Sequence, residues 1–381
     1  MNLNSNQQAF FALVKAGLWE QNGQLSSVGE IDFNVVSRIA EEQSVAGLVA
    51  GGIEHVKDVK VPTENALTFV GGTLQLEQRN MAMNQFIAEL IRKLREADIY
   101  AILVKGQGIA QCYERPLWRA CGDIDLFLSP QNYNQASSLL LTIASSVEEE
   151  NPNNKHLAMS IGGWTVELHG SLRCGLWSCI DNELDRVQDE IFYGGSVRSW
   201  LNGSTTVFLP AAVEDVVFVF SHILEHFFKE GIGLRQICDW CRLLWTFRDN
   251  LNKRLLGQCL NAMGVMTEWK TFASLVVEYL GMPVEAMPFY SPDKKWEKKA
   301  DRVMQFVMET GNFGQNRDYS YYQKYPYVIY KVISMWKHLQ DFGRYFVIFP
   351  LDSIKVTWRR MLVGFAVVLR RKDYKEKLIH I

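Results

Sequence analysis

The hydrophobic pattern of the chain changes after residue 97 and again after residue 209. Between these points, short apolar runs alternate with glycine-containing turns, a pattern typical of buried strands. Gly162-Gly163 separates two of the runs and predicts a two-residue hairpin turn. The segment 98–209 is therefore expected to form an α/β core. Its strands are predicted at 99–104, 124–128, 156–161, 164–169 and 206–209, and its short helices at 109–113 and 133–143.

Both flanks of this core carry apolar residues at helical spacing. The N-terminal segment 1–97 has one such run at 33–49 and a longer one at 64–97. No internal repeat of roughly 20–50 residues is visible, which argues against a solenoid. The sequence therefore predicts an α+β fold, with N-terminal helices before the core and a C-terminal helical domain at 210–381. Helices of that domain are expected at 211–228, 234–247, 253–263, 268–280, 294–309, 320–345 and 353–371.

Charge and composition exclude several classes of protein. The 381 residues include 40 Lys and Arg against 42 Asp and Glu, a net charge of −2, which argues against coating of nucleic acid through bulk positive potential. Residues 1–10 lack the features of a secretory signal, and every apolar run is far shorter than the ~18 residues of a membrane span. The seven scattered cysteines do not indicate a disulfide framework. We expect a soluble, cytoplasmic protein whose cysteines are mostly buried thiols.

The segment 122–128, with the sequence GDIDLFL, carries the strongest chemical signal. Side chains two positions apart on a strand share a face, so Asp123 and Asp125 are expected about 6.6 Å apart along the chain. The apolar residues that alternate with them then face the core. Two carboxylates at a cleft are commonly compensated by Mg²⁺ ions. For a lone Asp-x-Asp, however, an exposed acidic strand end is the simpler explanation.

Two further features favour the metal interpretation. Lys105-Gly106-Gln107-Gly108 lies between a predicted strand and a predicted helix. Glycines in such a turn let backbone N–H groups and the helix N-terminus approach a phosphate. Glu167 lies on the predicted strand 164–169, and a third carboxylate from a neighbouring strand can complete a two-metal site.

Taken together, this order of strands, glycine turn and acids resembles the polymerase-β nucleotidyltransferase superfamily. The sequence VKGQGIAQCY…PLWRACGDIDLFL is similar to the motifs of its bacterial branch, the uncharacterised nucleotidyltransferase family. The resemblance is strongest over residues 100–245. The positions that carry it are Lys105, Gly106, Tyr113, Arg119, Gly122 to Leu126, Glu167-Leu168-His169, Glu214-Asp215, His222, Leu234-Arg235 and Asp239-Trp240.

This resemblance implies a small mixed-sheet core that moves a nucleoside monophosphate from an NTP such as ATP to a hydroxyl of a small-molecule or protein acceptor. It implies that Asp123, Asp125 and Glu167 hold Mg²⁺ or Mn²⁺ and carry catalysis, and that His169 lines the acceptor pocket. The wider superfamily has Gly-Ser at the turn, so here Gln107 or backbone amides are expected to contact a phosphate. The nucleotide-binding residues implied are Lys105, Gly106, Gln107, Gly108, Arg119 and Gly122, with Lys105 and Arg119 facing the leaving pyrophosphate.

Other interpretations stay open at this stage. A catalytically silent relative would bind nucleotide or a partner without turnover, and a toxin-type transferase would modify RNA or a protein. Residues 351–381 hold eight Lys or Arg against three Asp or Glu, and we interpret them as a helix with one packed and one basic face rather than a membrane or nucleic-acid surface. His222-x₃-His226 and Cys238-x₂-Cys241 suggest zinc, but both pairs lie in apolar helical patterns and favour packing roles.

Overall fold

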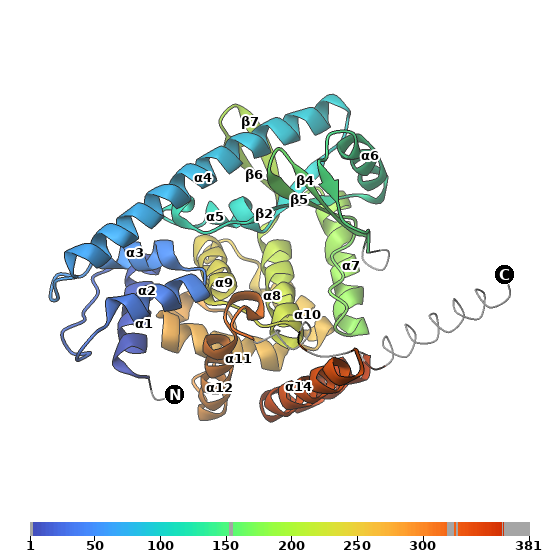
Figure 1. Ribbon diagram of the computed structural model, residues 1–381. Helices are drawn as coiled ribbons and strands as arrows, with labels where there is room; N and C mark the ends of the chain where they lie inside the picture. The colour runs from blue at the N-terminus through green and yellow to red at the C-terminus, as the bar shows by residue number, and fades with distance from the viewer. Residues whose placement is uncertain (1–2, 152–154, 318–323, 325–326, 360, 362–381) are drawn as a thin grey trace.

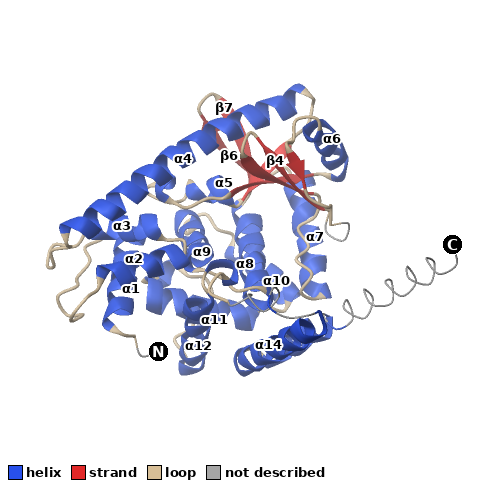
Figure 2. Cartoon of the chain, viewed as in Figure 1, coloured by secondary structure: helices blue, strands red, loops and turns tan. Residues whose placement is uncertain are grey.

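The chain folds into two layers. The structure is a computed structural model that describes residues 3–151, 155–317, 324, 327–359 and 361. One layer is a sheet with the long helix α4 (Thr63–Glu96) along its outer side, and the other is a set of helices from both ends of the chain (Figure 1). The strands gather in a single sheet surrounded by helices (Figure 2), which confirms the expected α+β class.

The sheet is mixed, and its central strand is the one that carries the paired aspartates. Its strands are β1 (Ala101–Val104), β2 (Asp123–Leu128), β3 (Ser146–Val147), β4 (His156–Ile161), β5 (Trp164–His169), β6 (Val197–Asn202) and β7 (Thr205–Pro210). Their spatial order is β3-β4-β5-β2-β1-β7-β6. Strand β2 pairs antiparallel with β1 and parallel with β5. Residues from β1, β2 and β5 are thereby brought side by side.

Strand β2 divides its side chains between two environments. Ile124, Leu126 and Leu128 are buried in an apolar cluster with α4 and α6 (Pro130–Leu141). Asp123 and Asp125 line a pocket together with residues of the helical layer. This division follows from the period of two along a strand. It confirms that the acids share one face and the apolar residues the other.

The helical layer joins segments that are far apart in the sequence. Helices of the N-terminal segment and of the region after residue 210 share one apolar core. Trp19 shows this directly, because its indole N–H donates to the backbone oxygen of Leu280 at 2.6 Å. The helices besides α4 and α6 are α1 (Ser5–Trp19), α2 (Phe33–Glu42), α3 (Ala46–Glu54), α5 (Gly106–Ala110), α7 (Ser178–Tyr193), α8 (Ala212–Lys229), α9 (Leu234–Phe247), α10 (Lys253–Met263), α11 (Met266–Leu280), α12 (Lys294–Thr310) and α14 (Tyr327–Ile348).

Most predicted elements are present, with small shifts at their ends. All five predicted strands are confirmed, and Gly162 and Gly163 form the hairpin turn with φ values of 59° and 84°. The structure also contains the edge strands β3 and β6 and the helix α7, which the sequence pattern does not predict. The short helix expected at 109–113 instead begins at Gly106. The predicted helices 320–345 and 353–371 fall partly outside the described residues.

The apolar run at 33–49 is two helices rather than one continuous segment. Helix α2 ends at Glu42 and α3 begins at Ala46. Between them the side chain of Gln43 is fully buried, donating to the backbone oxygen of Val307 at 3.2 Å and accepting from the backbone N–H of Leu234 at 3.0 Å. These contacts fix the chain between α2 and α3 within the helical layer. The spacing of apolar residues alone does not show this interruption of the helix.

Two observations bear on other expectations from the sequence. Within the described part of the chain, no helix is both long enough and apolar enough to cross a membrane. The seven cysteines are free thiols, six of them buried and Cys179 exposed.

Helices α1 and α3 pack at unusually short distance through glycines. A Cβ atom on Gly17 would lie 1.9 Å from the backbone oxygen of Leu48, and one on Gly52 would lie 2.0 Å from that of Leu13. Real Cβ atoms do not approach oxygen this closely, so any larger side chain would push the helices apart. The two glycines therefore set the distance between α1 and α3.

We expect Gly52→Ala to lower the free energy of unfolding by ~1–3 kcal/mol, because the added methyl group has no space between the helices. Gly72→Ala is the matched control, since Gly72 lies in α4 with nothing within 4 Å of its Cβ position. That substitution should raise the free energy of unfolding by up to ~1 kcal/mol through helix propensity. Urea denaturation measures both, and equal effects would contradict the close packing of α1 on α3.

Candidate active site

A row of ionisable side chains crosses one face of the sheet. In the parallel pair β2–β5, Asp125 is in register with Glu167, and in the antiparallel pair β4–β5, His156 is opposite His169. Asp123 precedes Asp125 by two residues, and Glu167 precedes His169 by two, so each pair shares a face. The sheet register thus brings five such groups from three adjacent strands onto one surface.

Asp125 is the buried centre of this row. Only 2% of its side chain is exposed. Its Oδ1 accepts hydrogen bonds from Lys105 Nζ at 2.7 Å and from His169 Nε2 at 2.8 Å. Burial by itself would raise the pKa of Asp125, but Lys105 and His169 outweigh it and hold the pKa well below its usual range. The carboxylate is therefore ionised and locked in place.

Asp123 lies in a different electrostatic situation. The charge of Asp125 and partial burial raise the pKa of Asp123, against the opposing influence of Lys105. Among the described residues none forms an ion pair with Asp123. Its negative charge is thus under-compensated at the wall of the cleft.

Glu167 is held between two imidazoles. Its Oε2 lies 3.0 Å from His156 Nε2 and 3.5 Å from His169 Nε2. Burial opposes ionisation, but the hydrogen bonds from His156 and His169 prevail and lower the pKa of Glu167 to about 2. Burial alone would lower the pKa of His169, but its hydrogen bonds to Asp125 and Glu167 raise the pKa above its usual value. Strand β5 therefore contributes an ionised carboxylate and a basic histidine.

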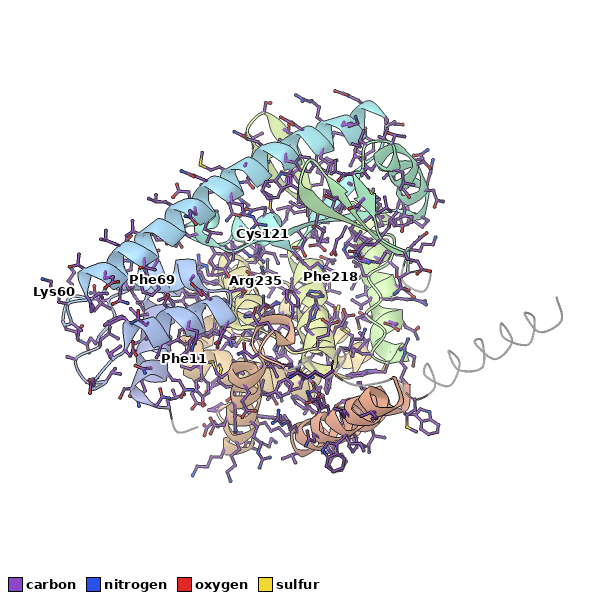
Figure 3. The ribbon with its side chains drawn as sticks, viewed as in Figure 1. Phe11, Lys60, Phe69, Cys121, Phe218 and Arg235 are labelled. Atoms are coloured by element: carbon purple, nitrogen blue, oxygen red, sulfur yellow. The ribbon has the colours of Figure 1, made fainter. Side chains whose placement is uncertain are left out.

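The helical layer completes the site from the other side. Figure 3 shows Arg235 of α9 and Phe218 of α8 on the side of the helical layer that faces the sheet, below Cys121, which precedes β2 by two residues. Arg235 donates to the backbone oxygen of Ala120 at 3.0 Å, but its buried Nε has no hydrogen-bond partner among the described residues. Burial and the neighbouring Arg119 lower the pKa of Arg235. A buried guanidinium of this kind is suited to an anion.

A neutral histidine faces the same zone from α8. Burial, together with the charges of Lys105 and His226, lowers the pKa of His222 to about 3. Its Nε2 lies 3.0 Å from His226 Nε2. The ring of Phe313, which has a positive φ of 51°, lies 4.8 Å from the His226 ring.

Arg119 lines the pocket beside the aspartates, but its guanidinium is already paired within the protein. Its Nε and Nη2 donate to the two oxygens of Asp239 at 3.0 and 2.6 Å, and both side chains are at least 94% buried. Tyr113 donates to the same carboxylate at 2.8 Å. Asp239 belongs to α9, so this bidentate pair joins the loop before β2 to the helical layer. The guanidinium at hand for a ligand is Arg235 instead.

The glycine turn has three different environments. Gly106 has a positive φ of 43° and lines the pocket beside Asp123 and Asp125. Gln107 points away from that pocket, because its amide donates to Asn80 Oδ1 at 2.8 Å on α4. A Cβ on Gly108 would lie 2.8 Å from Leu209 Cδ2, so this glycine permits packing on β7. Gly122 lies outside this turn, directly before β2, and is exposed, with nothing within 4 Å of its Cβ position.

Two cavities meet at this site. The smaller, of about 40 Å³, is lined by Lys105, Gly106, Asp125 and Arg235 among others. The larger, of about 480 Å³, lies between β5 and α8, a volume typical of small-molecule sites. Asp123, His222 and Phe313 line both. Asp123 therefore lies where the cavities join, and Asp125 lies beside it in the smaller cavity.

Several of these groups were not predicted from the sequence. Counting outward from the Gly162-Gly163 turn pairs His156 with His169, so the hairpin already contained the information needed to find His156. Arg235 is among the positions of the family resemblance, but the sequence assigns it no role, because its role depends on the packing of α9 against Ala120 in the loop before β2.

The zinc pattern His222-x₃-His226 with Cys238-x₂-Cys241 is not assembled. Both cysteines are fully buried in the apolar core. Within the part of the chain that the structure describes, the group of His, Cys, Asp or Glu side chains able to share one ion is His156, Glu167 and His169.

We expect Asp239→Asn to lower the free energy of unfolding by ~3–5 kcal/mol, because it leaves the buried Arg119 without its counter-charge. Asp249→Asn is the control, since the Asp249 side chain is 80% exposed and its loss should change stability by less than ~1 kcal/mol. Urea denaturation compares the two variants. A loss below 1 kcal/mol in Asp239→Asn would contradict a structural role for the Arg119 pair.

Comparison with known proteins addresses the same region. The family model described as "Uncharacterised nucleotidyltransferase" matches residues 29–281, which include the sheet, the glycine turn and the helices α8 and α9. No curated protein and no solved structure gives a significant match. The matched segment spans most of the chain and contains every residue of the site except Phe313. The chain therefore belongs to the uncharacterised nucleotidyltransferase family.

Proposed function

We propose that the protein is a metal-dependent nucleotidyltransferase that moves a nucleoside monophosphate from an NTP to a hydroxyl of a small-molecule or protein acceptor. The observation that carries the proposal is the register of β2 with β5, which aligns Asp125 with Glu167 and leaves Asp123 beside them at the junction of two cavities. Family membership supports the general class of reaction.

The chemistry of the carboxylates fits a divalent cation. Asp123 and Asp125 supply the oxygen ligands that Mg²⁺ and Mn²⁺ accept. The raised pKa of Asp123 reports negative charge that the described residues do not compensate. Asp123 and Asp125, with Glu167 completing the set, would hold such a cation, which would neutralise charge at the phosphates and lower the pKa of the acceptor hydroxyl.

The remaining groups have roles that follow from their charge and position. Arg235 would bind phosphate oxygens, and Lys105 would add a point charge near the leaving pyrophosphate. The acceptor oxygen forms a bond to the α-phosphorus as the bond to pyrophosphate breaks, and the acceptor proton passes to a carboxylate. Glu167 is the better base than Asp125, because its side chain is more exposed, at 23% against 2%, and its pKa is lowered less.

The larger cavity favours an uncharged or cationic acceptor. Its lining includes the carboxylates of Asp123, Glu167, Glu225 and Glu230 against the single guanidinium of Arg173. An acidic wall of this kind repels the phosphates of a nucleic acid. His169 lines this cavity too, which agrees with its proposed place in the acceptor pocket.

We expect Asp123→Asn to reduce NTP-dependent labelling of an acceptor at least ~100-fold, since a metal-ligating carboxylate contributes several kcal/mol to the transition state. The thermal midpoint should stay the same or rise, because the substitution removes repulsion with Asp125. The assay incubates the protein with each labelled NTP, Mg²⁺ or Mn²⁺ and cell extract.

Asp249→Asn, on the exposed surface, is the activity control. Full labelling by the Asp123→Asn variant would overturn the metal proposal. Metal-dependent NTP binding by the wild type without transfer to any acceptor would favour the catalytically silent alternative.

We expect Arg235→Met to raise the KM for the NTP by ~10–100-fold, because a charge-assisted hydrogen bond to phosphate is worth ~1.5–3 kcal/mol. Arg235→Lys should retain part of the affinity, as it keeps the charge but loses the planar fork. Steady-state kinetics with varied NTP measures both. An unchanged KM in Arg235→Met would show that Arg235 does not bind the nucleotide.

A further inference from the structure

The hairpin β4–β5 holds two histidines and one carboxylate on a single face. His156 is directly opposite His169, and Glu167 precedes His169 by two residues. Directly paired residues of an antiparallel ladder have Cβ atoms about 4.5–5.5 Å apart. The centroids of the two imidazole rings are 4.8 Å apart. The sheet thereby fixes the three side chains relative to one another.

The ligand atoms of this triad converge. One ligand atom from each of His156, Glu167 and His169 can be chosen so that all three lie within 4.8 Å of one another. The side chains are 29%, 23% and 14% exposed, respectively, on the wall of the larger cavity. They are therefore held in place by the sheet and partly open to solvent, so that an ion bound there would be accessible to water or a substrate.

The donor types differ from those of the neighbouring aspartates. Asp123 and Asp125 offer only carboxylate oxygens, which suit Mg²⁺. Two imidazole nitrogens and one carboxylate suit first-row transition-metal dications, and Mg²⁺ binds imidazole poorly. The site therefore contains two adjacent donor sets with different metal preferences, and Glu167, which the proposed function places with the aspartates, is shared by both.

We propose that His156, Glu167 and His169 form a binding site for a transition-metal dication of the Fe²⁺ to Zn²⁺ series, next to the Asp123/Asp125 position. The ion would bind to the β4–β5 hairpin in the absence of nucleotide. Its contribution to nucleotidyl transfer rests on the proposed function, whereas its binding does not.

A second pair of histidines in the same cavity is an alternative location for a metal ion. His222 and His226 are one turn apart on α8 and line the same cavity, with their Nε2 atoms 3.0 Å apart. They provide two nitrogens close to the triad but on the opposite wall. Any assignment of a metal to the hairpin must therefore be distinguished from binding on α8.

The test is titration of the full-length, nucleotide-free protein with CoCl₂, followed by calorimetry and by the visible absorption of Co²⁺, which reports its ligands. We expect one site whose affinity falls at least about 10-fold in His156→Gln and in His169→Gln. The variants His226→Gln and Asp123→Asn should change the affinity less than about 3-fold. An excess of Mg²⁺ should leave the Co²⁺ spectrum in place.

Two results would overturn the proposal. Loss of Co²⁺ binding in His226→Gln with normal binding in His156→Gln would place the ion on α8. Loss in Asp123→Asn together with displacement by Mg²⁺ would place it at the aspartates. Circular dichroism of each variant verifies folding, and Glu167→Gln, which keeps the shape of the side chain, provides an independent third variant with the same expected loss.

The outcomes also separate this inference from the proposed function. Co²⁺ binding that depends on His156 and His169, without transfer from any NTP, would support the metal site and contradict the transferase proposal. Transfer supported by Mg²⁺, with Co²⁺ affinity unchanged in both histidine variants, would support the transferase proposal and contradict the metal site on the hairpin.

Discussion

The buried charge of Asp125 is the constraint on which the rest of the site depends. A carboxylate at the centre of a sheet costs several kcal/mol unless cationic groups compensate it. Lys105 from the end of β1 and His169 from β5 supply that compensation through the same oxygen. Lys105 reaches it with a positive φ of 55°, a conformation that costs about 1–3 kcal/mol and persists only where the surroundings hold it. The bonds to Asp125 thus hold the ends of β1, β2 and β5 together at the cleft.

The helical layer encloses this row of charges and completes the site. Arg235 and His222 face the sheet from α9 and α8, and the Arg119–Asp239 pair joins the loop before β2 to α9. Because helices from both ends of the chain share one core, the position of Arg235 depends on residues far away in the sequence. The chemistry of the cleft therefore lies between the layers, with acids on one side and a buried cation on the other.

The strengths and errors of the sequence predictions have a common cause. Period-two patterns placed Asp123, Asp125 and Glu167 correctly on strands, because alternation along a strand is a local property. Gln107 (or backbone amides in its place) and Arg119 are expected at the nucleotide, and the structure adds that the Gln107 and Arg119 side chains bond to Asn80 and Asp239. Both are partners from other elements, and hydrogen-bonding capacity in a loop does not reveal which distant group will satisfy it.

By itself, the sequence determined the α+β class, the strands of the core other than β3 and β6, and the shared face of the two aspartates. Local spacing and turn chemistry suffice for these features, whereas the family was indicated by a resemblance of motifs. Only the tertiary structure decided that Glu167 is in register with Asp125, that His156 joins it, and that Arg119 is paired with Asp239 whereas the buried Nε of Arg235 has no hydrogen-bond partner among the described residues. Strand order and the docking of α9 bring these groups together, and both arise from burial of surfaces that are far apart along the chain.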